Sequence, residues 1–162
     1  MINQQELFTQ MAMQAWETNL KRMNDTFASL TDEQMMADIV PGRNRPLYLL
    51  GHMAAVHDRM LPLLGLGERK MEHLDNAFLI NPDKAVVELP SIAELRAHYA
   101  EANESINRQM GLLRGDEWFE KHTSVSEEDF AKEPHRNKLS ILNSRAHHVS
   151  YHLGQLMMAK NK

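Results

Sequence analysis

Residues 139–160 read LSILNSRAHHVSYHLGQLMMAK and are the most informative stretch of the chain. Their apolar side chains recur at intervals of three and four, which predicts an amphipathic α-helix. The main apolar stripe of this helix consists of Leu142, Ala146, Val149, Leu153, Leu156 and Met157. A helix with one apolar face has to pack that face against other elements, so the stretch predicts a helical domain around it.

Two histidines of this predicted helix can act together. His148 and His152 are four residues apart, so they project from one side of the helix, and both imidazoles can reach a single cation. His147 is excluded from the pair because it lies more than a third of a turn around the helix from His152. Neutral imidazole is the commonest metal ligand in proteins. The pair therefore predicts the local half of a metal site; the alternative is two exposed histidines on a polar flank.

Three further long helices are predicted. Residues 3–30 carry apolar side chains at helical spacing, with no proline or glycine to interrupt them. Residues 46–62 are apolar on nearly every side, which indicates a helix packed on several faces. The sequence Ser-Ile-Ala-Glu at residues 91–94 matches a capping box, which starts a helix that continues to about residue 113. With residues 139–160, these segments predict an all-α fold, a four-helix bundle formed by one domain over residues 1–162.

The helices are separated by two long connections. Residues 65–90 join the second and third helices and contain a possible short helical piece at residues 72–78. Residues 115–137 join the third and fourth helices and form a polar, charged loop with Trp118, Phe119 and Phe130 as anchors. A shorter helical turn is expected at residues 31–37. Long connections in a compact domain often shape a site, so the substrate-binding side of the bundle is expected there.

The second predicted helix offers two more histidines. His52 is one of few polar groups in an apolar segment, so it either makes a hydrogen bond inside the core or supplies a third metal ligand. His57 lies five residues further on and faces another direction, beside Asp58 and Arg59. It is expected to be solvated, with the lining of a pocket as the alternative.

Composition excludes several classes of function. The 162 residues are 43% hydrophobic and 25% charged, with a net charge of -4, so the chain has no basic field to hold a phosphate backbone, and no nucleic acid is expected as a partner. There are no cysteines, which excludes disulfides, thiolate ligands and a cysteine nucleophile. Any metal is therefore held by imidazole, carboxylate or water. Glycine-rich phosphate loops and the G-x-S-x-G and H-E-x-x-H motifs are absent from the sequence.

The sequence carries no targeting signal that we can identify. Its first residues, MINQQELF, lack a basic segment followed by an apolar run, and no stretch approaches the roughly 18 apolar residues needed to span a bilayer. The expected compartment is the cytoplasm. The twelve methionines are expected mainly in the core, as flexible packing residues.

Two motifs together resemble a known family. Leu50-Gly51-His52-Met53, preceded by Pro41-Gly42-Arg43-Asn44, is followed near the C-terminus by His148-x-x-x-His152-x-Gly154-Gln155. This arrangement resembles the DinB-like (YfiT-type) superfamily of metal-dependent four-helix bundles, over most of the chain. Leu153 departs from the pattern, because many members carry a basic residue there; the departure leaves the histidines intact and affects any substrate contact at that position.

The resemblance implies a metal site and a class of chemistry. It implies a divalent metal, usually zinc or nickel, held by His52, His148 and His152. It also implies a homodimer and a reaction in which a low-molecular-weight thiol attacks a small-molecule electrophile, as in thiol-dependent transferases and isomerases. Three nitrogen ligands leave positions open for water or substrate, as a catalytic metal needs. The alternatives are a non-catalytic, stress-associated protein that binds metal or a small ligand, and a bundle without any metal.

Three neighbours of the histidine pair have candidate roles. Gln155 follows His152 by three residues and is a candidate to hydrogen-bond the metal-binding histidines. Tyr151 points elsewhere on the helix and is expected to be a packing residue. Gly154 is expected to permit the close approach of another helix.

Overall fold

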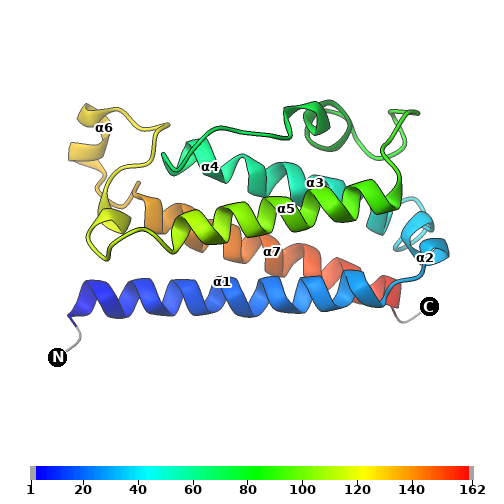
Figure 1. Cartoon of the computed structure of the whole chain (residues 1–162), viewed down its shortest axis with the longest axis horizontal. Coiled ribbons are helices and arrows are strands. Elements are labelled where there is room, and N and C mark those ends of the chain that lie inside the picture. The colour runs from blue at the N-terminus through cyan, green and yellow to red at the C-terminus, as the bar shows by residue number, and fades with distance from the viewer. Residues whose placement is uncertain (1–2, 161–162) are drawn as a thin grey trace.

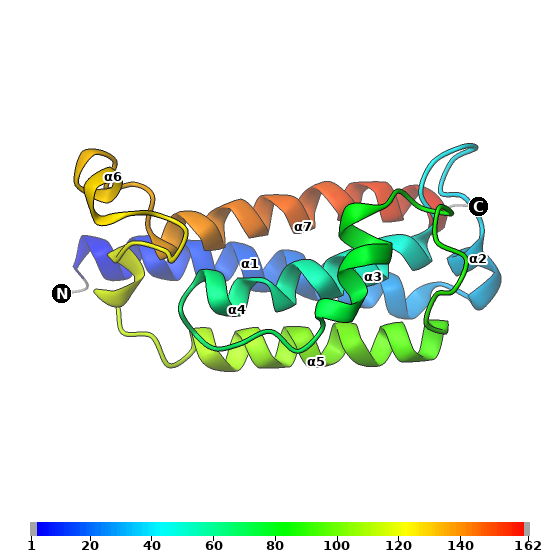
Figure 2. The same ribbon diagram turned by 90° about the horizontal axis from the view of Figure 1, so that it is seen from above.

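The computed structural model describes residues 3–160, and this part of the chain is helical and contains no β-strand. In chain order the elements are α1 (Gln4–Ser29), α2 (Asp32–Met36), α3 (Pro46–Asp58), α4 (Met60–Leu63), η1 (Glu72–Leu74), η2 (Asn76–Ile80), α5 (Ile92–Met110), η3 (Glu117–Phe119), α6 (Glu127–Lys132) and α7 (Lys138–Lys160). The four long helices α1, α3, α5 and α7 run lengthwise through the molecule, as Figures 1 and 2 show. The predicted all-α class is confirmed.

The helices begin where the sequence provides caps. Asn3, Thr31 and Ser91 each accept a hydrogen bond from the backbone N–H three residues later, and the side chain of that later residue bonds back, so α1, α2 and α5 all start with capping boxes. Pro46 occupies the first turn of α3, where its missing N–H costs nothing. The capping box predicted at residues 91–94 is confirmed.

The long helices enclose one apolar core. Helix α7 packs along α1, and α3 packs along α5 and also contacts α7. The core is closed by large side chains that are fully buried, among them Trp16, Met23, Leu50, Met53 and Ile106. Five members of the stripe predicted for α7 are buried, but Met157 is 42% exposed, so its assignment to the core was wrong.

The connection between α3 and α5 folds back along α3. Asp58, at the end of α3, is 1% exposed and accepts hydrogen bonds from the backbone N–H groups of Lys70 and Met71 and from the Arg69 guanidinium. Arg69 also forms a two-pronged ion pair with Asp75. These bonds fix the start of the connection and place η1 and η2 against α3. The helical piece predicted at residues 72–78 is confirmed, as two short non-α turns.

The second connection is more regular than the sequence suggested. Residues 115–137, predicted as a loop, include η3 and α6. Ser126 caps the start of α6, because its side chain accepts a hydrogen bond from the backbone N–H of Asp129. Trp118 anchors this connection in the core with 2% of its surface exposed.

His57 lies in the core, contrary to the prediction that it is solvated. It is 0% exposed, and its Nδ1 donates to Oδ1 of Asn103 on α5 over 2.5 Å. The edge of its ring meets Trp16 of α1, with ring centroids 5.0 Å apart. Helix α3 is covered by α5, α7 and the folded-back connection. His57 faces away from His52, but on that side of α3 it contacts another helix and not water.

Within residues 3–160, no helix combines the length and the apolar content needed to cross a lipid bilayer.

Candidate metal centre

Three histidines from two helices meet at one point. His52 comes from α3, and His148 and His152 come from α7, one turn apart. The Nε2 atom of His148 lies 3.3 Å from that of His52 and 3.0 Å from that of His152. Two nitrogens bound tetrahedrally at 2.0–2.1 Å to one zinc ion lie about 3.3 Å apart. The spacing of the three imidazoles therefore suits a single small cation.

This cluster is the one place, in the part of the chain that the structure describes, where at least three histidine, aspartate or glutamate side chains come close enough to hold a metal together. One ligand atom from each histidine lies within 4.8 Å of the other two. The sequence predicted these three residues as ligands, and the fold brings all three together. His147 is exposed and takes no part.

Two of the histidines are held in a ligand orientation by oxygen atoms. Nδ1 of His52 donates to the backbone carbonyl of Phe78 over 2.9 Å, and Nδ1 of His152 donates to Oε1 of Gln155 over 2.8 Å. A proton on Nδ1 leaves the lone pair of Nε2 free, and the Nε2 atoms are the ones that converge. The candidate role of Gln155 as a hydrogen-bond partner of the clustered histidines is thus supported by its bond to His152. Such partners fix the ring and its tautomer in known metal sites.

Phe78 can approach His52 because the residue before His52 on α3 is glycine, Gly51. A Cβ atom added to Gly51 would lie 2.5 Å from two ring carbons of Phe78, so the aromatic ring occupies the space that a side chain would take. Phe78 is fully buried within η2, whose π-helical turn presents the Phe78 carbonyl to His52. Packing therefore explains the Gly-His pair of the sequence motif. Gly51 leaves room for the Phe78 ring, and the backbone carbonyl of Phe78 orients His52.

Substituting Gly51 with alanine is expected to destabilise the protein by about 1–3 kcal/mol, the usual cost of overpacking a well-packed core. The new methyl group displaces Phe78 and disturbs its hydrogen bond to His52. Chemical denaturation of both proteins measures the loss. Gly154→Ala is the matched control, because nothing lies within 4 Å of its added Cβ and alanine favours a helix. Equal stability of Gly51→Ala and the wild type would contradict this account of the packing.

The electrostatics of the cluster favour neutral imidazoles. Burial lowers the pKa of His52 and of His152 below the ordinary value of 6.5. Burial, followed by the neighbouring charges of His152, His52 and Arg145, lowers the pKa of His148 to about 3. Only the neutral ring has a lone pair for a metal. The three rings are therefore ready to coordinate at neutral pH without losing a proton first.

Two expectations about the neighbours of His152 were wrong. Tyr151 is 64% exposed, so it is not a core packing residue; its ring touches the edge of His152, with centroids 5.0 Å apart. Gly154 is exposed and has no atom within 4 Å of an added Cβ, so it admits no neighbouring helix. On the other side of the site, Tyr48 stacks on His52 at a centroid distance of 6.2 Å.

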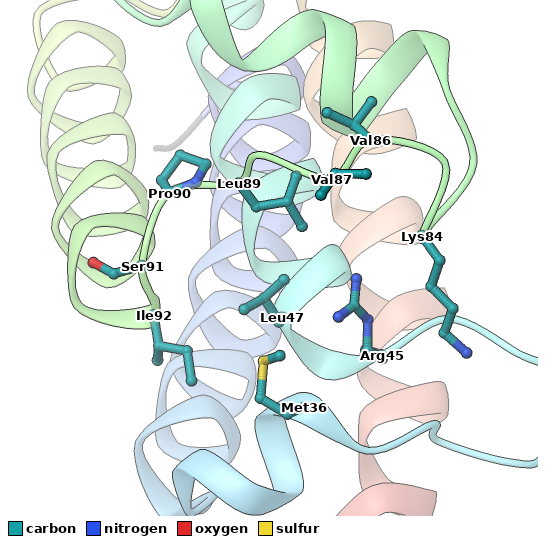
Figure 3. Close-up of a pocket in the computed structure, with 10 residues that line it drawn as sticks. All are labelled: Met36, Arg45, Leu47, Lys84, Val86, Val87, Leu89, Pro90, Ser91 and Ile92. Atoms are coloured by element: carbon teal, nitrogen blue, oxygen red, sulfur yellow. The ribbon is translucent and has the colours of Figure 1, made fainter.

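A cavity of about 450 Å³ opens beside the cluster. It is lined by Tyr151 and Gln155, which both contact His152, and by Arg43 and Asn44 of the loop before α3. A cavity of about 470 Å³ lies elsewhere, between α2, the start of α3 and the segment before α5 (Figure 3). Its lining is mainly apolar and includes none of the three histidines, and its Arg45 is already paired with Asp83. Of these two cavities, the one at Gln155 is therefore the better placed to deliver a small molecule to the cluster.

The fold and the site together define a class: an all-helical protein in which three histidines from two long helices could hold a metal ion. No protein-family model matches the chain, and no curated protein matches it. The residues of this chain are therefore what indicates its function.

Proposed function

We propose that this protein is a metal-dependent enzyme of the DinB-like type, a four-helix bundle that transfers a low-molecular-weight thiol to a small electrophile or carries out a related hydrolysis. Its metal would be zinc or nickel, held by His52, His148 and His152. The observation that carries the proposal is the convergence of three Nε2 atoms with Nε2–Nε2 distances of 3.0 and 3.3 Å.

The donor set fits a catalytic metal. Three neutral imidazoles bind zinc, nickel or cobalt, and no carboxylate joins the group among residues 3–160. Three protein ligands leave at least one position for an exchangeable molecule, whereas a structural zinc site has four. A metal held by these three imidazoles would lower the pKa of a bound water or thiol and so would supply a nucleophile near neutral pH.

The surrounding residues have defined tasks in this proposal. The Phe78 carbonyl and the Gln155 side chain keep His52 and His152 oriented, so the site needs little rearrangement to bind a metal. Tyr48 covers one face of the His52 ring and is itself fixed by a hydrogen bond from its hydroxyl to the Asn81 carbonyl. The cavity beside Gln155 would receive the electrophile.

Metal analysis and thiol-transfer assays test the proposal in two steps. We expect about one zinc or nickel ion per chain after native purification or loading, and less than a tenth of an ion would overturn the site. We then expect the loaded protein to couple small thiols to electrophiles, and His152→Ala to abolish the reaction. A loaded protein without turnover, whose rate equals that of His152→Ala, would leave a metal-binding protein that is not an enzyme.

A further inference from the structure

Arg145 is a cation without a counterion beside the histidine cluster. It lies on α7, three residues before His148 and seven before His152, and these spacings put all three on one side of the helix. Among the described residues, its side chain makes no ion pair or hydrogen bond, and its Nε is buried without a partner. Arg145 is half-buried, and a charged group that leaves water with an unpartnered N–H is costly, so the position calls for an explanation.

Other partly buried arginines of the chain are satisfied. Arg45 forms a two-pronged ion pair with Asp83, and Arg69 pairs with two aspartates. Arg96 donates to two backbone carbonyl groups at the end of α1. Arg145 differs from all three in having no acceptor among residues 3–160, although all four arginines are half-buried. The fold thus supplies acceptors for these three guanidinium groups and leaves none for Arg145.

His148, like Arg145, has a buried nitrogen without a hydrogen-bond acceptor in the described part of the chain. The Nδ1 atoms of His52 and His152 each have an oxygen acceptor, but Nδ1 of His148 is buried and has no partner within residues 3–160. When Nε2 of a histidine binds a metal, Nδ1 carries a proton and needs an acceptor. Arg145 and His148 are neighbours on one helix face, so the two unsatisfied donors lie one turn apart.

The charge of Arg145 reaches the whole cluster. Helices α3 and α7 run in opposite directions (Figure 1) and meet at His52 and His148, so residues that follow His52 on α3 lie beside residues that precede His148 on α7. Consistent with that position, the guanidinium contributes, after burial, to the lowered pKa values of His52, His57 and His148. A fixed positive charge beside a metal site repels the metal ion. An anion on Arg145 would remove that repulsion and supply the missing acceptor.

We propose that Arg145 binds a carboxylate group of the thiol or of its co-substrate, and so holds that molecule next to the metal. The planar guanidinium offers two parallel N–H donors that match the two oxygens of a carboxylate. The same carboxylate would serve as acceptor for His148. This inference rests on the proposed function and narrows its substrate class to small carboxylic acids.

The test compares two small thiols on cobalt-loaded protein. The charge-transfer absorption between cobalt and a bound thiolate reports the Kd of 3-mercaptopropionate, which carries a carboxylate, and of 2-mercaptoethanol, which does not. In the wild type we expect the ratio of the two Kd values to favour 3-mercaptopropionate about tenfold. In Arg145→Gln we expect a ratio within about twofold of unity, with partial recovery in Arg145→Lys. Arg108→Gln, which removes the same charge from an exposed site on α5, should keep the wild-type ratio.

A second measurement separates this inference from the metal site. Propionate is titrated into metal-free protein while the NMR signal of the Arg145 Nε–H, assigned by its loss in Arg145→Gln, is followed. Movement of that signal supports the anion site even if no metal is bound and the proposed function fails. An equal preference of wild type and Arg145→Gln for the two thiols, or an Arg145 signal that propionate does not move, would overturn the assignment.

Discussion

Replacing His148 with alanine is expected to weaken the binding of zinc or nickel by at least about 100-fold, because the loss of even an outer partner of a metal ligand costs 10–100-fold. The Nε2 atom of His148 is within 3.3 Å of both other Nε2 atoms, so it is the shared member of the cluster. Without it two imidazoles remain, too few for a specific site. Competition with a chromophoric chelator measures the Kd, and the metal-induced rise in Tm should disappear in parallel.

His147→Ala is the matched control for this substitution. It removes an imidazole from the adjacent, exposed position of the same helix and should leave the Kd at the wild-type value. Circular dichroism checks that both variants retain their helices. A His148→Ala protein that binds zinc as tightly as the wild type, or a His147→Ala protein that loses binding equally, would show that the metal is held elsewhere.

The local half of this site was predictable from the sequence, and the other half required packing. The four-residue spacing of His148 and His152 fixes their relation within one helix, whatever surrounds it. His52 was indicated only by its apolar setting and by the family resemblance, because no sequence rule tells which helices become neighbours. The sequence did not indicate that the Phe78 carbonyl bonds to His52, because every residue has a backbone carbonyl and the π-helical turn that directs this one was not predicted.

The errors share a cause. Periodicity orders residues around their own helix but does not reveal how many other elements cover it. Helix α3 is covered on several sides, so His57 is buried; α7 is open along one flank, so Tyr151 and Met157 are exposed. Asn103 could have corrected the first error, because it is a polar residue on the inner face of α5, where a polar side chain needs a partner.

The bounds of the long helices were predicted within a few residues, whereas the content of the connections was not. The capping box that starts α5 was predicted from the sequence, and apolar spacing alone placed the start of α1 within one residue. Helix α6 was missed although Ser126 stands three residues before Asp129, an acceptor and an acidic residue at the spacing of a helix start. Arg145 was also missed, because the absence of a counterion appears only once all neighbours are known.

Acidification is expected to destabilise the metal-free protein, with His57 responsible for about 3 kcal/mol of the loss between pH 6.5 and 4. Burial lowers the pKa of His57 to about 4, while its hydrogen bond to Asn103 opposes the change and the charges of Arg145 and His52 add to it. In the unfolded chain the pKa is near 6.5, so the unfolded state binds more protons in this range. The contribution is complete above pH 6.5 and is lost as pH falls through 4, and one pKa unit corresponds to about 1.4 kcal/mol.

Denaturation with a chelator present, at several pH values, measures this effect. His57→Gln and His57→Leu should both show a slope of unfolding free energy against pH that is reduced by the same amount, although their stabilities at pH 7 differ. That agreement isolates protonation of His57 from the loss of its packing against Trp16 and from titration of the three clustered histidines, which all the proteins retain. If either variant kept the full wild-type slope, His57 would not be the neutral buried base that its place between α1 and α5 implies.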